Sequence, residues 1–154
     1  MDFPRRRRPT QVDVQQTGDV AFASHSQEIH SLTALLGVGR LAIGSAFLAY
    51  PTESVRILGI DTASANRMVW LARMTAVRDA ALGLGVLGSA ATGRGRVPAL
   101  MLSALVDATD AVVLAVAARE KRVDRVRGYA AAAVGAAGAL AGLAAAATLL
   151  RRAR

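Results

Sequence analysis

Four long apolar segments alternate with short polar connections along the chain from about residue 31 to its end. Each segment holds roughly the 20 apolar residues that a helix needs to cross the hydrocarbon layer of a membrane. Pro51 ends the first segment, Gly93 supplies a stop after the second, and Pro98 suits the first turn of the third. The pattern therefore predicts four transmembrane helices. They are expected over residues 25–50, 67–92, 97–118 and 128–150.

Short connections make neighbouring helices antiparallel, so the expected fold is all-α, a four-helix up-down transmembrane bundle formed by residues 25–154. The first 24 residues are mostly polar and contain the run Arg5–Arg8. A secretory signal would place its apolar region close behind these arginines, whereas here roughly 20 mostly polar residues follow them. Residues 1–24 are therefore expected to form a disordered basic arm.

The composition favours helices that pack closely inside a membrane. Hydrophobic residues make up 53% of the chain, but only 4% of it is aromatic. Alanine and glycine would pack weakly in a water-soluble core, whereas membrane helices associate through close backbone approach. Gly135, Gly138 and Gly142 mark the expected packing face of the last segment, although a Gly-x-x-x-Gly spacing also arises by chance in such a segment. The absence of cysteine excludes disulfides and thiol catalysis.

The net charge of +8 is distributed as membrane proteins distribute it. All but three of the 19 lysines and arginines fall in tails and connections, where positive side chains anchor helices at lipid headgroups. The expected headgroup anchors at the two termini are Arg5, Arg6, Arg7, Arg8, Arg151 and Arg152. The expected partners are therefore membrane lipids and either a homo-oligomer or a larger membrane complex, and nucleic acid is not among them.

The charges also predict the orientation of the protein in the plasma membrane. The side that holds both termini and the 93–96 turn carries nine basic residues, against seven on the other side. The first helix and the arginine run before it usually dominate, so both termini are expected in the cytoplasm. Tyr50, Trp70 and Tyr129 flank the opposite side, as an aromatic belt does.

Three of the four segments carry charged residues near their centres, where charges are costly and are normally paired or functional. The first segment has one arginine, the second an adjacent Arg-Asp pair with a further arginine five residues earlier, and the third two aspartates. Their similar depth predicts a single cluster, in which three arginines balance three aspartates. The expected members are Arg40, Arg73, Arg78, Asp79, Asp107 and Asp110.

The spacing of the charges indicates which of them meet. Asp107 and Asp110 share one helix face because they are three residues apart. Arg78 and Asp107 lie at comparable depth on antiparallel neighbours, so they are the first expected pair, and Asp79 is expected to meet another arginine. Two interpretations stay open: a buried polar lock that fixes helix register, and a site for a small molecule, a lipid or a proton.

The sequence contains no enzyme signature, and no cofactor or metal is expected. His25 and His30 lie near the amino terminus, and their spacing differs from the three or four residues that place metal ligands on one helix face. Residues 83–88 spell Gly-x-Gly-x-x-Gly, but they lie in a helical pattern without a preceding strand, so the match is a chance one. The chain is therefore not expected to be an enzyme.

An ordered series of motifs resembles a known layout. The series comprises Gly-Arg-Leu at 39–41, Tyr-Pro at 50–51, RILGI at 56–60 and VRDAALGLGVL at 77–87. An Asp-bearing third helix and a fourth helix of small residues follow. Over roughly residues 30–150 the chain resembles small bacterial four-helix membrane proteins of unknown function, with a DoxX-like layout. The resemblance implies a fold and an inner-membrane location, and it implies no activity.

The expected function is that of an integral membrane protein that acts as a structural or accessory subunit, or as a member of a complex, with the charge cluster locking its helices. The alternative is a small binding or transport protein that takes a small molecule, a lipid or a proton at the cluster. A ligand-sized cavity that reaches the cluster would favour the alternative, whereas a dry and fully paired cluster would favour the structural function.

Overall fold

The computed structural model describes residues 31–153, and within this range every regular element is a helix. The expected all-α fold class is therefore confirmed. The predicted basic arm over residues 1–24, with its anchors Arg5–Arg8, lies outside the described residues. So do the predicted start of the first helix and both histidines.

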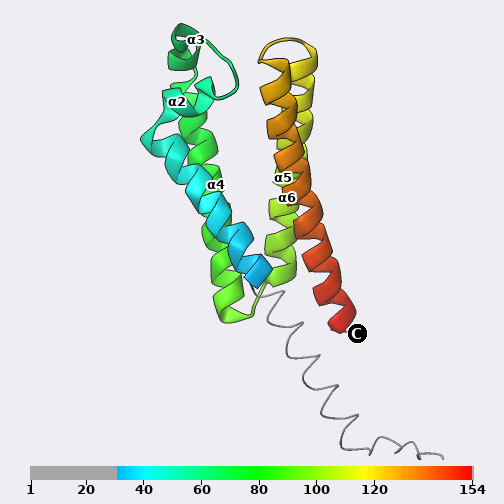
Figure 1. Ribbon diagram of the computed structural model, residues 1–154. Coiled ribbons are helices and arrows are strands. Elements are labelled where there is room, and N and C mark those ends of the chain that lie inside the picture. The colour runs from blue at the N-terminus through cyan, green and yellow to red at the C-terminus, as the bar shows by residue number, and fades with distance from the viewer. Residues whose placement is uncertain (1–30, 154) are drawn as a thin grey trace, which may run out of the picture.

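Four long helices and two short ones make up the described chain (Figure 1). The long helices are Ser31–Ala49, α4 (Val69–Thr92), α5 (Arg96–Arg119) and α6 (Arg125–Arg152). The short helices α2 (Pro51–Arg56) and α3 (Thr62–Arg67) occupy the connection between the first two long helices. The described ends of the long helices lie within three residues of the bounds expected from the apolar pattern.

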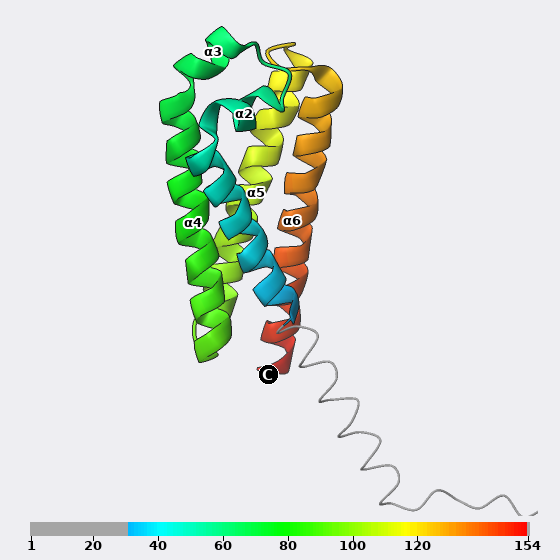
Figure 2. The ribbon, with the colours of Figure 1, turned by 60° about the vertical axis from the view of Figure 1, so that its left-hand side comes forward.

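The connections gather at the two ends of the molecule. Figures 1 and 2 show α2, α3 and the α5–α6 turn at one end, and the α4–α5 turn with the carboxyl end of α6 at the other. The backbone amide of Asp124, in the α5–α6 turn, donates to the carbonyl oxygen of Leu58 at 2.9 Å. This bond ties the α2–α3 connection to the second half of the chain.

Local chemistry explains where the long helices begin and end. Gly93 ends α4 in the left-handed conformation that glycine adopts without strain, as the sequence predicts. The side chain of Arg96 then folds back and donates to the carbonyl oxygens of Ser89 and Ala90 at the end of α4. The carboxylate of Asp124 accepts from the amide of Arg127 and so caps the start of α6.

The short helix α3 has a similar cap. Asp61 precedes it, and its carboxylate accepts from the backbone amide of Ser64 at 3.0 Å. Hydrogen bonds from the hydroxyl and the amide of Ser64 favour the charged carboxylate and lower the pKa of Asp61 below its usual value. The connection between the first two long helices is thus ordered by its own hydrogen bonds.

The helix Ser31–Ala49 packs tightly against α4 through glycines. A Cβ atom at Gly44 would lie 2.8 Å from the carbonyl oxygen of Ala76, and one at Gly83 would lie 2.9 Å from that of Gly37. Both distances are shorter than real Cβ contacts, so neither position has room for a side chain. These two helices form a close pair in which backbone meets backbone, as small residues allow in membrane proteins.

A second close pair consists of α5 and α6, again joined through glycines. Gly142 faces Ala104 and the carbonyl oxygen of Leu100, while Gly135 faces Ala111 and the carbonyl oxygen of Asp107. Gly138 faces the carboxylate of Asp107 itself. The three glycines that the sequence singles out on α6 therefore all lie against α5. By contrast, α4 and α5 approach each other much less closely.

Two apolar clusters lie near the ends of the bundle, and the first of them joins the two pairs. One contains Val86 and Leu100, with partly buried residues of the helix Ser31–Ala49 and of α6 packed around them. The other, beside α2 and α3, is built around Val55, Ala65 and Ala72. The middle of the bundle lies between these layers and holds the charged residues.

The surface of the long helices is largely apolar. Ser31–Ala49, α5 and α6 are each long and apolar enough to cross a membrane, and only about a fifth of each span is buried within the protein. Their exposed residues include Leu35, Leu105, Val112, Leu140 and Leu143. Such a surface is costly in water and matches the hydrocarbon of a lipid bilayer, so the structure is that of a membrane protein.

The close pair formed with α4 provides a matched test. Gly83→Ala places a methyl group against backbone atoms that cannot move aside, and overpacking of this kind costs about 1–3 kcal/mol. Gly85→Ala, two residues along the same helix, meets nothing within 4 Å and gains helix propensity. We expect Gly83→Ala to lower unfolding stability in detergent and Gly85→Ala to leave it equal or higher. Equal losses in both variants would contradict the packing described here.

Candidate functional site

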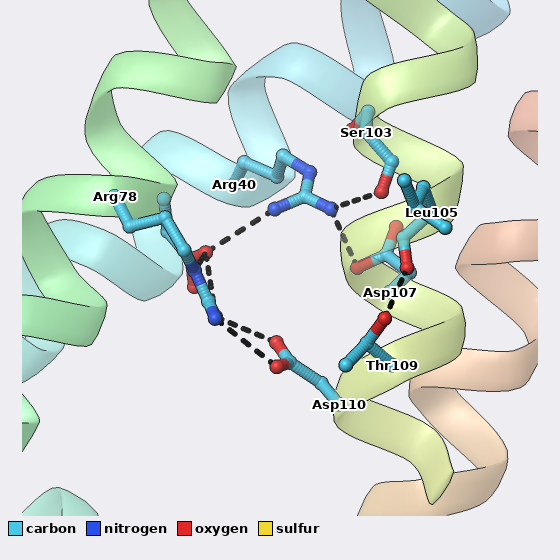
Figure 3. A network of polar contacts seen from close by, with 8 residues as sticks. Arg40, Arg78, Ser103, Leu105, Asp107, Thr109 and Asp110 are labelled. Carbon is cyan, nitrogen blue, oxygen red and sulfur yellow. Dashed lines mark hydrogen bonds and ion pairs between the residues drawn. The ribbon is translucent and has the colours of Figure 1, made fainter.

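Five charged residues from three helices meet in the middle of the bundle. Arg40 is the central residue of the helix Ser31–Ala49, Arg78 and Asp79 lie near the centre of α4, and Asp107 and Asp110 lie near the centre of α5. Figure 3 shows Arg40 and Arg78 reaching across to the two aspartates of α5. We call these five residues the ionic network.

Arg40 is the most buried charge of the network, with 8% of its side chain exposed. Its Nη1 lies 3.2 Å from Oδ1 of Asp79, and its Nη2 lies 2.7 Å from Oδ1 of Asp107. Nη2 also donates to the backbone carbonyl oxygen of Ser103 at 2.7 Å (Figure 3). One guanidinium therefore joins its own helix to α4 and to α5, and so bridges the two close helix pairs.

Arg78 makes the second bridge between α4 and α5. Its Nη1 and Nη2 donate to Oδ1 and Oδ2 of Asp110 at 3.1 and 2.6 Å, which is the two-pronged geometry that arginine and carboxylate favour (Figure 3). Its Nε and Nη2 also lie 3.3 and 3.2 Å from Oδ1 of Asp79. The side chains of Arg78 and Asp110 are 38% and 36% exposed, so this pair lies at the edge of the network.

The contacts form a chain of alternating sign that runs Asp107, Arg40, Asp79, Arg78, Asp110. Each arginine lies between two carboxylates, and Asp79 lies between the two arginines. Alternating charges polarise one another favourably in a medium of low dielectric constant, and a gap in such a chain is costly there. No buried side-chain nitrogen or oxygen among the described residues lacks a hydrogen-bond partner.

The first expected pair, Arg78 with Asp107, is wrong. Arg78 pairs with Asp110, and Arg40 pairs with Asp107. The reason is depth in the bundle. Arg40 and Asp107 both lie at the midpoints of their helices. Arg78 and Asp110 each lie two to three residues from the midpoint, toward the end of the bundle that carries α2 and α3. Asp79 does meet other arginines, namely Arg40 and its neighbour Arg78.

Arg73 does not join the ionic network, although its inclusion was expected to balance the charge. It is exposed on α4, nearer to Trp70, and no ion pair joins it to another of the described residues. Trp70 is itself exposed and follows α3 closely, and the exposed Tyr50 and Tyr129 lie directly before α2 and near the start of α6. A long arginine side chain beside such residues can extend toward a membrane surface.

Sequence reasoning missed the carbonyl oxygen of Ser103 as a partner of Arg40. A backbone acceptor carries no signal in residue type, so only the position of Ser103 one turn before Asp107 on α5 could have indicated it. Of the expected headgroup anchors, Arg151 and Arg152 are exposed in the last turn of α6. Within the described part of the chain, no group of three or more His, Cys, Asp or Glu side chains is arranged to hold a metal ion.

The central position of Arg40 can be tested with a matched control. Arg40→Gln leaves two carboxylates without their shared cation, and removal of one partner of a buried ion pair typically costs about 3–5 kcal/mol. Arg73→Gln removes the same charge from an exposed site, where substitutions usually change stability by about 0.5 kcal/mol or less. In thermal unfolding in detergent, Arg40→Gln should therefore melt at a much lower temperature than the parent, whereas Arg73→Gln should melt near the parent's temperature. Similar melting temperatures for both would show that Arg40 does not bridge the helix pairs.

Comparison with known proteins identifies no relative: no family model, no curated protein and no solved structure matches this chain.

Proposed function

We propose that the chain is a four-span protein of the plasma membrane, in which the helices Ser31–Ala49, α4, α5 and α6 alternate in direction and both termini are cytoplasmic. Three of these helices qualify as spans by length and apolarity. The fourth, α4, has 24 residues and is about 36 Å long at 1.5 Å per residue, which exceeds the roughly 30 Å of the hydrocarbon layer.

The charges of α4 are compatible with a span because of where they lie. Arg78 and Asp79 are held in the ionic network, and Arg73 lies toward the end of α4 that carries the exposed Trp70. Many of the remaining exposed side chains of α4 are apolar, among them Met74 and Leu84. A charged residue is tolerated in a span when it is paired or can reach the membrane surface.

Within this membrane protein, we propose a structural or accessory function, as a subunit that forms or supports a membrane complex. The observation that carries the proposal is the closure of the ionic network on itself: both arginines are engaged by carboxylates of the same chain. Such a network fixes the register of helices whose other contacts are made by alanine and glycine. An enzymatic function has no support in these residues.

A second function, binding of a proton or of a small cationic ligand at the network, is favoured by one specific observation. With Arg73 outside, the network contains three carboxylates and two arginines. The resemblance to DoxX-like proteins remains a prediction, and it would supply the layout of the helices rather than their activity.

The absence of cysteine makes the topology directly testable, because a single introduced cysteine is the only thiol of the chain. Lys121→Cys places it in the exposed α5–α6 turn, and Arg94→Cys places it in the exposed α4–α5 turn. In intact cells, a membrane-impermeant maleimide should label Lys121→Cys, whereas Arg94→Cys should react only after permeabilisation. The opposite result would reverse the orientation, and equal labelling of both would contradict the number of spans between them.

Native mass spectrometry of the full chain, extracted from its own membrane in mild detergent, tests the proposed function. We expect a homo-oligomer or a complex with another protein in fixed stoichiometry, since an accessory subunit has to be held by what it supports. A monomer without any protein partner would contradict the structural function. A monomer that retains a small molecule would favour the second function instead.

A further inference from the structure

The ionic network carries one negative charge too many. Its three carboxylates and two arginines sum to −1 if every group is ionised. The last long helix, α6, contributes nothing to offset this charge, because it contains no charged residue between Arg127 and Arg151. An uncompensated charge inside a membrane protein is costly, and the usual outcome is that the group binds a proton and becomes neutral.

We propose that the network holds one proton, and that it resides on the outer carboxylate oxygen of Asp107, Oδ2. The proposal rests on the second function considered above and makes it specific, since it names the ligand, its stoichiometry and the atom that takes it. It also retains the structural function, because a neutral network still joins the two helix pairs.

The contacts of the three carboxylates distinguish them. Asp110 uses both oxygens in its two-pronged contact with Arg78, so protonation there would break one of these bonds. Asp79 accepts hydrogen bonds from both arginines, all of them at Oδ1, so its carboxylate lies against two cations. Asp107 contacts a single arginine, Arg40, at Oδ1, and no hydrogen bond within the described residues reaches its Oδ2. Asp79 and Asp107 could each take a proton at Oδ2 without losing a bond, but neutral Asp79 would weaken contacts with two arginines and neutral Asp107 with only one. Asp107 is therefore the carboxylate that loses least when it takes a proton.

The packing of α6 also bears on this atom. A Cβ atom at Gly138 of α6 would lie 2.9 Å from Oδ2, so only a glycine lets α6 pack this close to the carboxylate. The side chain of Asp107 is 24% exposed, compared with 10% for Asp79, which gives it the easier access for a proton. A glycine of α6 thus faces the carboxylate oxygen to which the proton is assigned.

The charges that face Asp107 come from every helix around it except α6. Arg40 of the helix Ser31–Ala49 favours the charged form, whereas Asp79 of α4 and Asp110 of α5 disfavour it. Arg78 lies beyond these two aspartates and is already shared between them. Asp107 therefore has one adjacent cation, Arg40, and two anions near it, Asp79 and Asp110. Both oxygens of Asp110 are already paired with Arg78. This arrangement favours a neutral Asp107.

Carbodiimide labelling provides the test, because dicyclohexylcarbodiimide reacts with protonated carboxyl groups in apolar surroundings. The full chain would be placed in nanodiscs of phosphatidylcholine, treated at neutral pH, and mapped by peptide mass spectrometry. We expect an adduct on Asp107 that declines as the pH rises, and none on Asp79 or Asp110. Labelling of Asp79 or Asp110 in place of Asp107, or of none of the three, would overturn the proposal.

A variant at a different residue separates a bound proton from a merely reactive side chain. Asp110→Asn removes one negative charge, so the network becomes neutral with Asp107 ionised, and labelling of Asp107 at neutral pH should fall several-fold. Asp124→Asn is the matched control, since it removes a carboxylate outside the network and keeps an oxygen to cap α6. Unchanged labelling in Asp110→Asn would overturn the proposal, as would an equal fall in Asp124→Asn.

Labelling in different salts distinguishes a bound proton from a bound metal ion at Asp107. Labelling should be the same in sodium, potassium and choline chloride at constant pH and ionic strength. Protection by sodium or potassium alone would replace the proton with that ion and overturn the proposal. Asp107 can fail to label while the subunit stoichiometry and the cysteine topology hold, and in that case the proton assignment alone is lost.

Discussion

The guanidinium of Arg40 is the contact on which the arrangement of the helices depends. It is shared between Asp79 of α4 and Asp107 of α5, and thereby connects two helix pairs that are otherwise each held by glycine and alanine. Between α4 and α5 the close approach seen within the pairs is missing. In lipid, hydrophobic burial gives helices little reason to associate, so packing and polar contacts must supply the specificity. Arg40 supplies it at the midpoint of the bundle.

The position of the network between two apolar layers increases its importance. The layer around Val86 and Leu100 lies on one side of the charges, and the cluster around Val55 and Ala72 lies on the other side, within the first helix pair and its connection. Low dielectric surroundings strengthen each correct ion pair and raise the cost of any unpaired charge. A slip of one helix by a single turn would separate Arg40 from its partners. The network therefore selects one register among several that small-residue packing alone would allow.

The apolar pattern was sufficient to predict the helices, because segment length and breaks at Pro51 and Gly93 depend on local chemistry. It was also sufficient to indicate that charges at similar depth belong together. The pairing was not predictable in the same way, since it depends on depth differences of two or three residues. Arg73 could not be excluded from the sequence, because its exposure follows from the rotation of α4 about its axis. The role of the Ser103 carbonyl has no counterpart in residue type.

A network that locks helices and a network that holds a proton make different demands, and this site can meet both. A lock needs every charge paired, which the inner members Arg40 and Asp79 achieve. A proton site needs one carboxylate that can be either charged or neutral. That carboxylate must lie at an end of the chain of ion pairs, where its neutralisation does not interrupt the contacts between the other members. Asp107 is such an end, and α6 faces it with Gly138 rather than with a side chain. The tight contact between α5 and α6 thus leaves the lock intact, and Gly138 accommodates the outer carboxylate oxygen of Asp107.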